Sequence, residues 1–469
     1  MIETNSPAAA SPVMLDDNLT VSTVISGLDQ PTSMAFIGSN DFLVLERATG
    51  KVQRIVNGTL HSTPLDLAVN NASERGLLGI ALHQKFSQNG FVYLFWTESS
   101  TGTDTSNVDQ VALLGNRVDR YIWNGSVLTF DRNVIKLRSL QPDTGQPSRG
   151  NHNGGVVRVG PDGKVYIIFG DNGRRGFLQN ITSGGPVPDD QFGGPEPDDA
   201  HLTGVVLRLN DDGSTPTDNP FFDAQTNFTG EAAANIKKVF AYGVRNSFGM
   251  DFDPLSGALW TQENGDDAFD EINRVTPGFN GGWIQTMGPV SRVDQFKSIE
   301  MTYGAGNLQQ LRWPPSNIAP TPQQAVSRMF MLPGAQYLDP EFSWKYALAP
   351  SPIGGVTPAG RGWVLDESSR VRVREDPMAT TSYPERQPAT VEVRLRDVRV
   401  RAGGVRRRPG GRRRRPLVGA ARRPAPGAAR CPPARRAPAR TARRRCRRAR
   451  SAMESWSHTR RAPRCSRTR

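Results

Sequence analysis

The sequence GNHNGGVVRVGPDGKVYIIFGDNG, residues 150–173, decides the fold that we expect for this chain. Two short runs of alternating apolar residues flank a Pro-Asp-Gly turn at 161–163, in which proline fixes φ and glycine takes the positive-φ position. The segment therefore predicts a β-hairpin that is entered and left through polar, glycine-rich loops. His152 lies in the first loop, at the start of a strand, where a rigid scaffold can hold it over a cleft. An ordinary surface histidine is the alternative interpretation of this residue taken alone.

Three other segments repeat this pattern of an apolar run, a polar turn and a second β-run: residues 33–45, 79–96 and 249–260. Each is expected to form the inner hairpin of a four-stranded antiparallel blade. Outer strands are expected between them, for example at 50–56 and 118–123. Repeated hairpins with long variable insertions predict an all-β fold of the β-propeller type, whereas a generic β-sandwich would not repeat one pattern four times.

Long polar insertions separate these hairpins, and long loops in a compact β domain are often functional. They are expected on one face, around a site, at residues 98–114, 175–205 and 213–235. Residues 300–350 are interpreted as an excursion between blades. The predicted organisation is an N-terminal extension at 1–24, the propeller at 25–356, an uncertain propeller remnant at 357–400 and a tail at 401–469.

Charge is distributed very unevenly along the 469 residues. The tail at 401–469 holds 25 Arg, no Lys and one acidic residue, Glu454, so residues 1–400 carry about −11 of the overall +13. An acidic body argues against nucleic acid as its partner and is compatible with cation binding. The three cysteines also lie in the tail, so disulfides play no part in the predicted body. No apolar run reaches the roughly 18 residues of a membrane helix, and no signal peptide is visible at the start.

The tail consists almost entirely of Arg, Pro, Ala and Gly, a composition that cannot bury a core and predicts disorder. These residues have GC-rich codons, so we interpret the tail as the product of a frameshift or mis-assembled end. A disordered basic arm is the alternative.

Three further loops carry polar groups that could do chemistry beside His152. Arg245 and Asn246 precede an inner strand and offer donors suited to carboxylates or a developing oxyanion. Residues 263–271 contain five carboxylates, which repel one another unless a cation or basic groups lie among them. Glu74 and Arg75 form a charged pair before another inner strand. A surface salt bridge, a solvated acidic loop and similar structural roles remain the alternatives.

Together these loops resemble the soluble PQQ-dependent sugar dehydrogenases, the glucose/sorbosone dehydrogenase family, which are six-bladed β-propellers. The resemblance spans roughly residues 25–350. It rests on the order and spacing of these motifs: Glu74-Arg75-Gly76-Leu77-Leu78-Gly79, Asn151-His152-Asn153-Gly154-Gly155, Gly160-Pro161-Asp162-Gly163, Gly170-Asp171-Asn172-Gly173, Gly243-Val244-Arg245-Asn246 and Asp270-Glu271-Ile272-Asn273.

The resemblance implies an oxidoreductase with PQQ and Ca²⁺ as cofactors and a sugar or polyol as substrate. His152 matches the general base, Arg245 and Asn246 match residues that hold the quinone, and Gly265 and Asp266 match a Ca²⁺ position. The matching cleft residues are Glu74, Asn151, Asp171 and Asn172. Family members usually act outside the cytoplasm, which implies a periplasmic or secreted location.

Three departures from the family pattern affect these expectations. Asp266 stands where the family often has proline, so its side chain could bind metal directly. The cofactor-binding lysine has no match in 355–390. Arg394 and Arg396 resemble a quinone clamp but lie near the arginine-rich tail, and a disrupted last blade is expected. A Ca²⁺-dependent propeller lactonase and a non-catalytic binding module remain alternative functions.

Overall fold

The computed structural model describes residues 23–141, 148–185, 190–224, 228–303, 313–351 and 353, together with the backbone of two strands at 370–374 and 390–394. All of these belong to the first of two compact units of the chain, residues 1–399. Residues 1–22 of the predicted N-terminal extension, most of the predicted remnant at 357–400 and the whole predicted tail lie outside the described residues.

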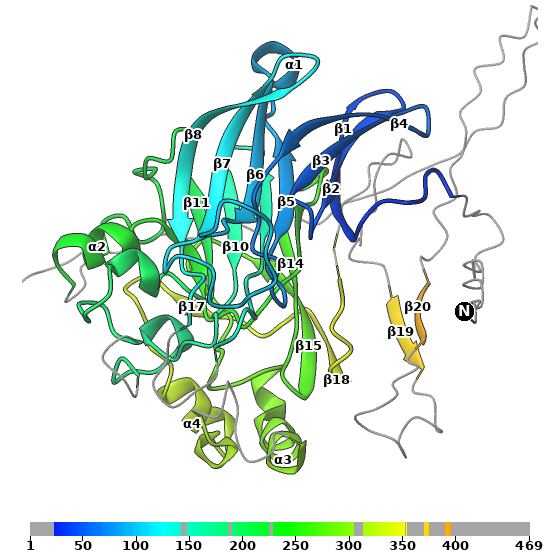
Figure 1. The fold of residues 1–469 in the computed structure, drawn as a ribbon. Coiled ribbons are helices and arrows are strands. Elements are labelled where there is room, and N and C mark those ends of the chain that lie inside the picture. The colour runs from blue at the N-terminus through cyan, green and yellow to red at the C-terminus, as the bar shows by residue number, and fades with distance from the viewer. Residues whose placement is uncertain are drawn as a thin grey trace, which may run out of the picture. The chain divides into compact units, whose positions relative to one another are not determined.

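Four sheets of four or more strands follow one another along the described chain (Figure 1). The first contains β1 (Pro31–Gly38), β2 (Asp41–Glu46), β3 (Lys51–Val56) and β4 (Thr59–Asp66), and the second contains β5 (Leu77–Leu82), β6 (Phe91–Thr97), β7 (Asn116–Trp123) and β8 (Leu128–Leu137). Within both sheets each strand pairs antiparallel with the next in sequence.

The third sheet contains β9 (Val156–Val159), β10 (Val165–Phe169), β11 (Val205–Leu209) and β12 (Val239–Tyr242), and the short parallel strands β16 (Phe279–Asn280) and β17 (Gln336–Tyr337) extend it. The fourth contains β13 (Gly249–Phe252), β14 (Leu259–Glu263), β15 (Ala268–Val275) and, as its last strand, β18 (Phe342–Tyr346). The excursion expected at 300–350 therefore also completes a sheet. A separate hairpin pairs β19 (Arg370–Arg374) with β20 (Thr390–Arg394).

All four predicted inner hairpins are present, as the pairs β1–β2, β5–β6, β9–β10 and β13–β14. The predicted outer strands at 50–56 and 118–123 are also confirmed, as β3 and β7. The first strands of successive sheets contact one another in the order β1, β5, β9, β13. This is the arrangement in which propeller blades pack. The all-β character is thus confirmed, while a closed ring of six blades stays a prediction.

The core lies between adjacent sheets, where apolar residues of neighbouring sheets pack against one another. Phe95 of β6 stacks on Phe169 of β10 with ring centroids 6.4 Å apart, which joins the second sheet to the third. Tyr166 of β10 meets Phe252 of β13 edge-on at 4.9 Å, which joins the third to the fourth. These aromatic contacts fix the relative positions of the strands whose ends carry the polar loops.

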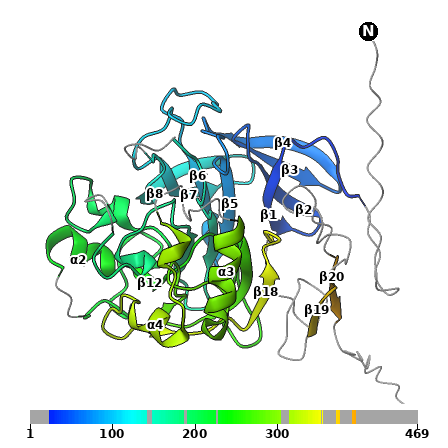
Figure 2. The ribbon, with the colours of Figure 1, turned by 90° about the horizontal axis from the view of Figure 1, so that it is seen from below.

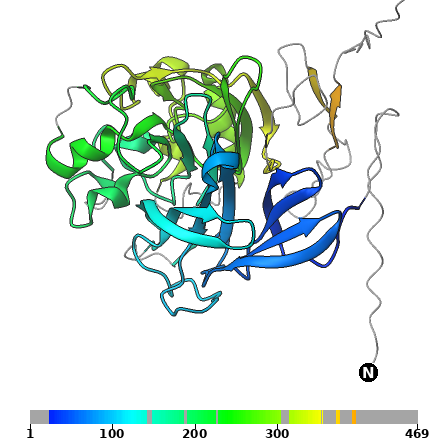
Figure 3. The same ribbon diagram turned by 90° about the horizontal axis from the view of Figure 1, so that it is seen from above.

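Short helices fill the connections between strands. They are α1 (Phe86–Asn89), η1 (Phe177–Gln179), η3 (Asp198–His201), α2 (Gly230–Ile236), η4 (Val290–Arg292), α3 (Val293–Tyr303), η5 (Pro315–Asn317) and α4 (Pro322–Ser327). Helices α3 and α4 lie at one end of the strands, onto which Figure 2 looks. The β5–β6 connection with α1 lies at the opposite end, seen in Figure 3.

Candidate active site

The predicted site residues gather at one end of the sheets because of antiparallel pairing. His152 precedes β9 and Asp171 follows β10, while Arg245 follows β12 and Gly265 follows β14. Two of these loops are held in left-handed backbone conformations that are rare for residues other than glycine, with φ of 57° at His152 and 51° at Asn172. Such conformations cluster at functional sites, where the surrounding structure over-determines them.

A buried carboxylate orients the imidazole of His152. Asp171 Oδ1 lies 2.7 Å from His152 Nδ1, and Asp171 Oδ2 accepts a hydrogen bond from Trp283 Nε1 at 2.7 Å. Asp171 is fully buried and His152 is 8% exposed. The carboxylate can only accept, so Nδ1 carries the proton in this contact and Nε2 is left as the basic nitrogen. His152 is therefore an oriented residue and not an ordinary surface histidine.

Glu74 joins the histidine loop to the arginine loop. Its Oε2 accepts a hydrogen bond from the His152 backbone N at 2.6 Å and from Asn246 Nδ2 at 3.1 Å. Asn246 Oδ1 in turn accepts from Gly154 N at 3.2 Å. The side chain of Asn246, predicted to bind the cofactor, thus lies in a network that supports the backbone of the histidine loop.

Arg245 is buried and lies against Trp283, which bonds the carboxylate of Asp171. Its guanidinium lies 5.5 Å from the ring centre of Trp283, donates from Nη1 to Asn264 O at 3.1 Å and forms an ion pair with Asp266. Burial acts to lower the pKa of Arg245, but the carboxylates of Asp266, Asp171 and Glu300 outweigh it and raise that pKa. Arg245 is therefore a permanent positive charge at the site.

The predicted acidic loop is largely internal instead of solvated. Burial, then the charge of Glu271, raises the pKa of Glu263 well above its ordinary value. Burial likewise raises the pKa of Glu271 to about 7 and that of Glu300 to about 9. Asp270 accepts from the backbone N of Gly265 at 2.8 Å and of Ala349 at 2.8 Å, which fixes the loop that contains Gly265 and Asp266.

The remaining predicted cleft residues lie in the same network. Asn172 Nδ2 donates to Asn151 O at 3.2 Å, and Asn151 Oδ1 accepts from Ser73 Oγ at 3.2 Å. Arg75 does not pair with Glu74: it is fully buried and donates to the backbone carbonyls of Val108, Ser139 and Arg149. Arg396 lies outside the described residues, and of Arg394 only the backbone, at the end of β20, is described.

Sequence reasoning missed two residues of the site. Trp283 bridges Asp171 and Arg245, and its signal was the Gly281-Gly282-Trp283 sequence after β16, where a large aromatic residue follows two glycines. Glu263 accepts from the backbone N of Arg245. The sequence shows Glu263 only as one of five carboxylates at 263–271, because it does not indicate which of them is buried.

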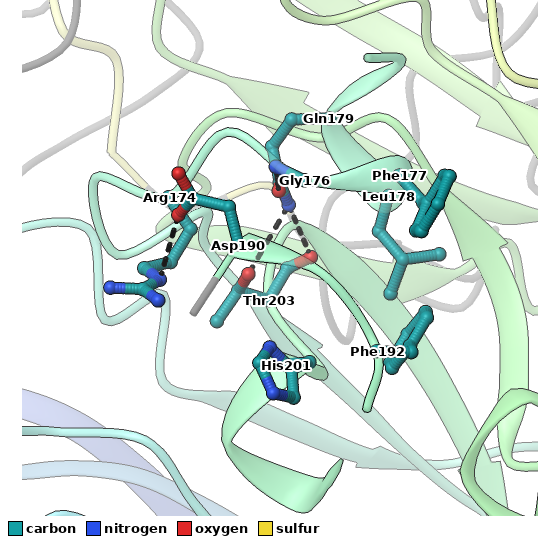
Figure 4. Close-up of a pocket in the computed structure, with 9 residues that line it drawn as sticks. All are labelled: Arg174, Gly176, Phe177, Leu178, Gln179, Asp190, Phe192, His201 and Thr203. Atoms are coloured by element: carbon teal, nitrogen blue, oxygen red, sulfur yellow. Dashed lines mark hydrogen bonds and ion pairs between the residues drawn. The ribbon is translucent and has the colours of Figure 1, made fainter. Parts of the chain in front are cut away.

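A small pocket lies in the predicted insertion 175–205 (Figure 4). It is lined by apolar rings such as Phe177 and Phe192 and by polar groups such as Arg174, Asp190 and His201. None of the predicted site residues lines it. Gln179 Nε2 donates to Thr203 O at 2.6 Å, and this hydrogen bond joins two of the residues that line the pocket.

Unpartnered polar atoms at the floor of the site are consistent with a polar ligand. Among the described residues, Arg245 Nε, Asn172 Oδ1 and Asn264 Oδ1 are buried without a hydrogen-bond partner. Buried polar groups are normally satisfied, so these atoms mark where a bound molecule or water would be held. A quinone with several carboxylates fits the donors of Arg245. No group of three or more His, Cys, Asp or Glu side chains in the described part of the chain could hold a metal ion.

A sequence profile of one family, described as Glucose / Sorbosone dehydrogenase, matches residues 28–405. The chain belongs to this family. The match extends past the predicted propeller boundary at 356 and includes the segments of β19 and β20.

Individual relatives share about a third or less of their residues with this chain. Quinoprotein glucose dehydrogenase B of Acinetobacter calcoaceticus is 32% identical over 281 residues, which are 58% of this chain and 54% of the relative. The Hedgehog-interacting protein of Mus musculus is 30% identical over 247 residues, 49% of this chain and 31% of the relative. The chain thus spans about half the length of the first of these relatives. The PQQ-bound aldose sugar dehydrogenase of Streptomyces coelicolor is similar at 26% identity, with a TM-score of 0.40 and coverage of 63% of this chain and 69% of that one.

Proposed function

We propose that this chain oxidises a hydroxyl of a sugar or polyol, with PQQ as the electron acceptor and Ca²⁺ as an assisting cation. The observation that carries the proposal is the His152–Asp171 contact at 2.7 Å beside the buried Arg245, at one end of the sheets. Family membership and the quinoprotein relative support it. The six-bladed closure and the extracytoplasmic location expected for the family are part of the same proposal.

The proposed chemistry removes a hydride and a proton from one carbon–oxygen unit of the substrate. His152 Nε2 accepts the hydroxyl proton, and Asp171 stabilises the imidazolium that forms because its carboxylate accepts from Nδ1. PQQ, when bound, supplies the acceptor for the hydride. Arg245 holds the cofactor and stabilises negative charge that develops on its oxygens.

The surrounding residues keep these groups in place. Trp283 and Gly173 N both donate to the Asp171 carboxylate, so the imidazole has one preferred orientation. Glu74 holds the backbone of His152, and Asn151 and Asn172 form the polar wall on which sugar hydroxyls would bind. A Ca²⁺ ion, when bound, would be held by oxygen groups of the loop that contains Gly265 and Asp266.

The test is titration of purified protein with PQQ and CaCl₂, followed by reduction of an artificial dye across a panel of aldoses and polyols. We expect activity that depends on PQQ and disappears in His152→Ala. The matched control is His83→Ala, because His83 lies at the opposite end of the second sheet, beside α1. Folded protein that binds no PQQ would refute the dehydrogenase.

Two other functions would then be separated by a second assay. Hydrolysis of lactones that needs Ca²⁺ but no quinone would assign a lactonase. Protein that folds, binds no PQQ and hydrolyses no lactone would be a binding module, a possibility that the similarity to a Hedgehog-interacting protein keeps open.

A further inference from the structure

The guanidinium of Arg245 is already occupied by a carboxylate of the same chain. Asp266 Oδ1 accepts from Arg245 Nη2, and the side chains of this ion pair are 10% and 23% exposed. Asn264 O takes Nη1 and Asp266 takes Nη2, so among the described residues only Nε is left without a partner. A carboxylate that accepts two parallel hydrogen bonds needs Nη2, and it therefore competes with Asp266 for this donor. An anionic ligand of Arg245 would therefore have to displace Asp266 from this donor.

We propose that Asp266 is an internal counterion that must leave Arg245 before a cofactor oxygen can bind there, so that Asp266 sets the affinity of the site for the quinone. This inference rests on the proposed function, because it assumes that PQQ is the ligand of Arg245. It identifies Asp266 as a residue that sets ligand affinity without itself holding the ligand.

The two partners differ in their freedom to move. Arg245 is fixed by the ring of Trp283 and by the carbonyl of Asn264, and its backbone N donates to the buried Glu263. Asp266 is the more exposed partner, on the loop between β14 and β15. Exchange of partners therefore requires movement of Asp266, while Arg245 stays in place.

Neighbouring charge determines where Asp266 can go. Its loop also carries Asp267, whose backbone N donates to Glu300 Oε1 at 2.9 Å, and Asp270 lies four residues after Asp266. A carboxylate released from Arg245 would face this acidic surrounding, which disfavours its release in the absence of a cation. A divalent cation near Gly265 and Asp266 would offset that repulsion. Cation and quinone should therefore bind with positive coupling, and the coupling must be reciprocal.

The experiment measures the PQQ dissociation constant by fluorescence quenching or calorimetry, in EGTA and in CaCl₂, without turnover. The variants are Asp266→Asn, Arg245→Ala and Asp267→Asn, the last being a matched control that removes one negative charge from the same loop. In EGTA we expect Asp266→Asn to bind PQQ at least about tenfold more tightly than the unaltered chain. In CaCl₂ this difference in PQQ affinity between Asp266→Asn and the unaltered chain should become smaller. Asp267→Asn keeps the Arg245–Asp266 ion pair and removes only one repelling charge, so it should tighten PQQ binding in EGTA by less than about threefold.

The outcomes separate the two proposals. If the unaltered chain binds PQQ and Arg245→Ala weakens binding, but Asp266→Asn binds no more tightly in EGTA, the counterion role is wrong and the proposed function stands. If no folded variant binds PQQ in either buffer, the proposed function fails and this inference falls with it. Circular dichroism checks folding. Should Asp266→Asn not fold, Asp266→Ser takes its place, and a Ca²⁺ dependence of PQQ affinity equal to that of the unaltered chain would overturn the inference.

Discussion

Replacement of Asp171 by asparagine is the most informative perturbation of this site, because three donors converge on one carboxylate. His152 Nδ1, Trp283 Nε1 and the backbone N of Gly173 all lie 2.7 Å from its two oxygens. Asparagine has the same shape but only one acceptor oxygen, and its NH₂ group must face one of the ring N–H groups.

Both orientations of the new amide are unfavourable. If the amide oxygen faces His152, the NH₂ opposes the buried Trp283 Nε1–H and leaves it unpaired, which costs about 1–3 kcal/mol of stability. If it faces Trp283, the NH₂ opposes the backbone N–H of Gly173, donates to His152 Nδ1 and moves the imidazole proton to Nε2. That tautomer cannot accept the substrate proton at Nε2, and loss of general-base catalysis is worth roughly 10²–10⁴-fold in rate. We therefore expect kcat of Asp171→Asn to fall by at least about 100-fold, with a small change in KM.

The assay is steady-state dye reduction by PQQ-loaded protein, combined with ¹⁵N NMR of the apo-protein to identify the His152 tautomer. Trp283→Phe is the matched control: it removes one donor to Asp171 but keeps the contact with His152, so its loss of kcat should be much smaller. An Asp171→Asn protein that keeps kcat within about threefold of the unaltered chain would refute the assignment of His152 as a base oriented by Asp171.

Three predictions concern the fold around the site. Arg75→Met should lower the free energy of unfolding by about 3 kcal/mol or more in urea denaturation, because three carbonyls lose a buried donor; a change below about 1 kcal/mol would contradict that role. Burial raises the pKa of Glu271 to about 7 in the folded chain from an ordinary 4.5, so the protonated form favours folding. The contribution of Glu271 to stability should be complete below about pH 4.5, fall as pH rises and level off above about pH 7, a loss on the order of 3 kcal/mol; the difference in Tm between the unaltered chain and Glu271→Gln, followed against pH, measures it, and a difference that does not change with pH would assign the dependence to another group. Gly170→Ala should reduce kcat more than Gly38→Ala, the same change at the end of strand β1, because a Cβ at position 170 would collide with the carbonyl of His152; equal effects in dye reduction would show that the loop can adjust.

Much of the fold could be predicted from sequence because strand and turn signals are local. The Pro161-Asp162-Gly163 turn and its counterparts determine where chains reverse, and the inner hairpins appear in the structure where the pattern placed them. The pairing of β18 with β15 could not be predicted, because the two are separated by more than sixty residues and β18 has only five residues with no repeat of the hairpin pattern. Short strands far from their partners carry little signal of their own.

The site shows the same division between local and long-range information. Sequence identified His152, Arg245 and Asp171 as polar residues at strand ends, which is a local property. It could not assign Asp171 to the imidazole, since a carboxylate that follows one strand can face either a cleft or its neighbour. Nor could it distinguish Glu74 from Arg75. Both residues lie in the turn before β5, where no regular alternation determines the direction of a side chain. Only the three-dimensional structure shows that the acid turns to the site and the arginine to the carbonyls of Ser139 and Arg149.

His152 and Arg245 are connected through Asp171, and this connection determines how substitutions at the site should combine. Asp171 N donates to the carbonyl of Arg245 at 2.7 Å, so the carboxylate that orients His152 is attached through its own backbone to the residue that would hold the cofactor. Trp283 makes a second connection, since it bonds Asp171 and lies against Arg245. Substitutions at Asp171 and Arg245 should therefore be non-additive, as expected for residues that share partners. A double variant whose loss of PQQ affinity equals the sum of the two single losses in free energy would show that the two loops act independently.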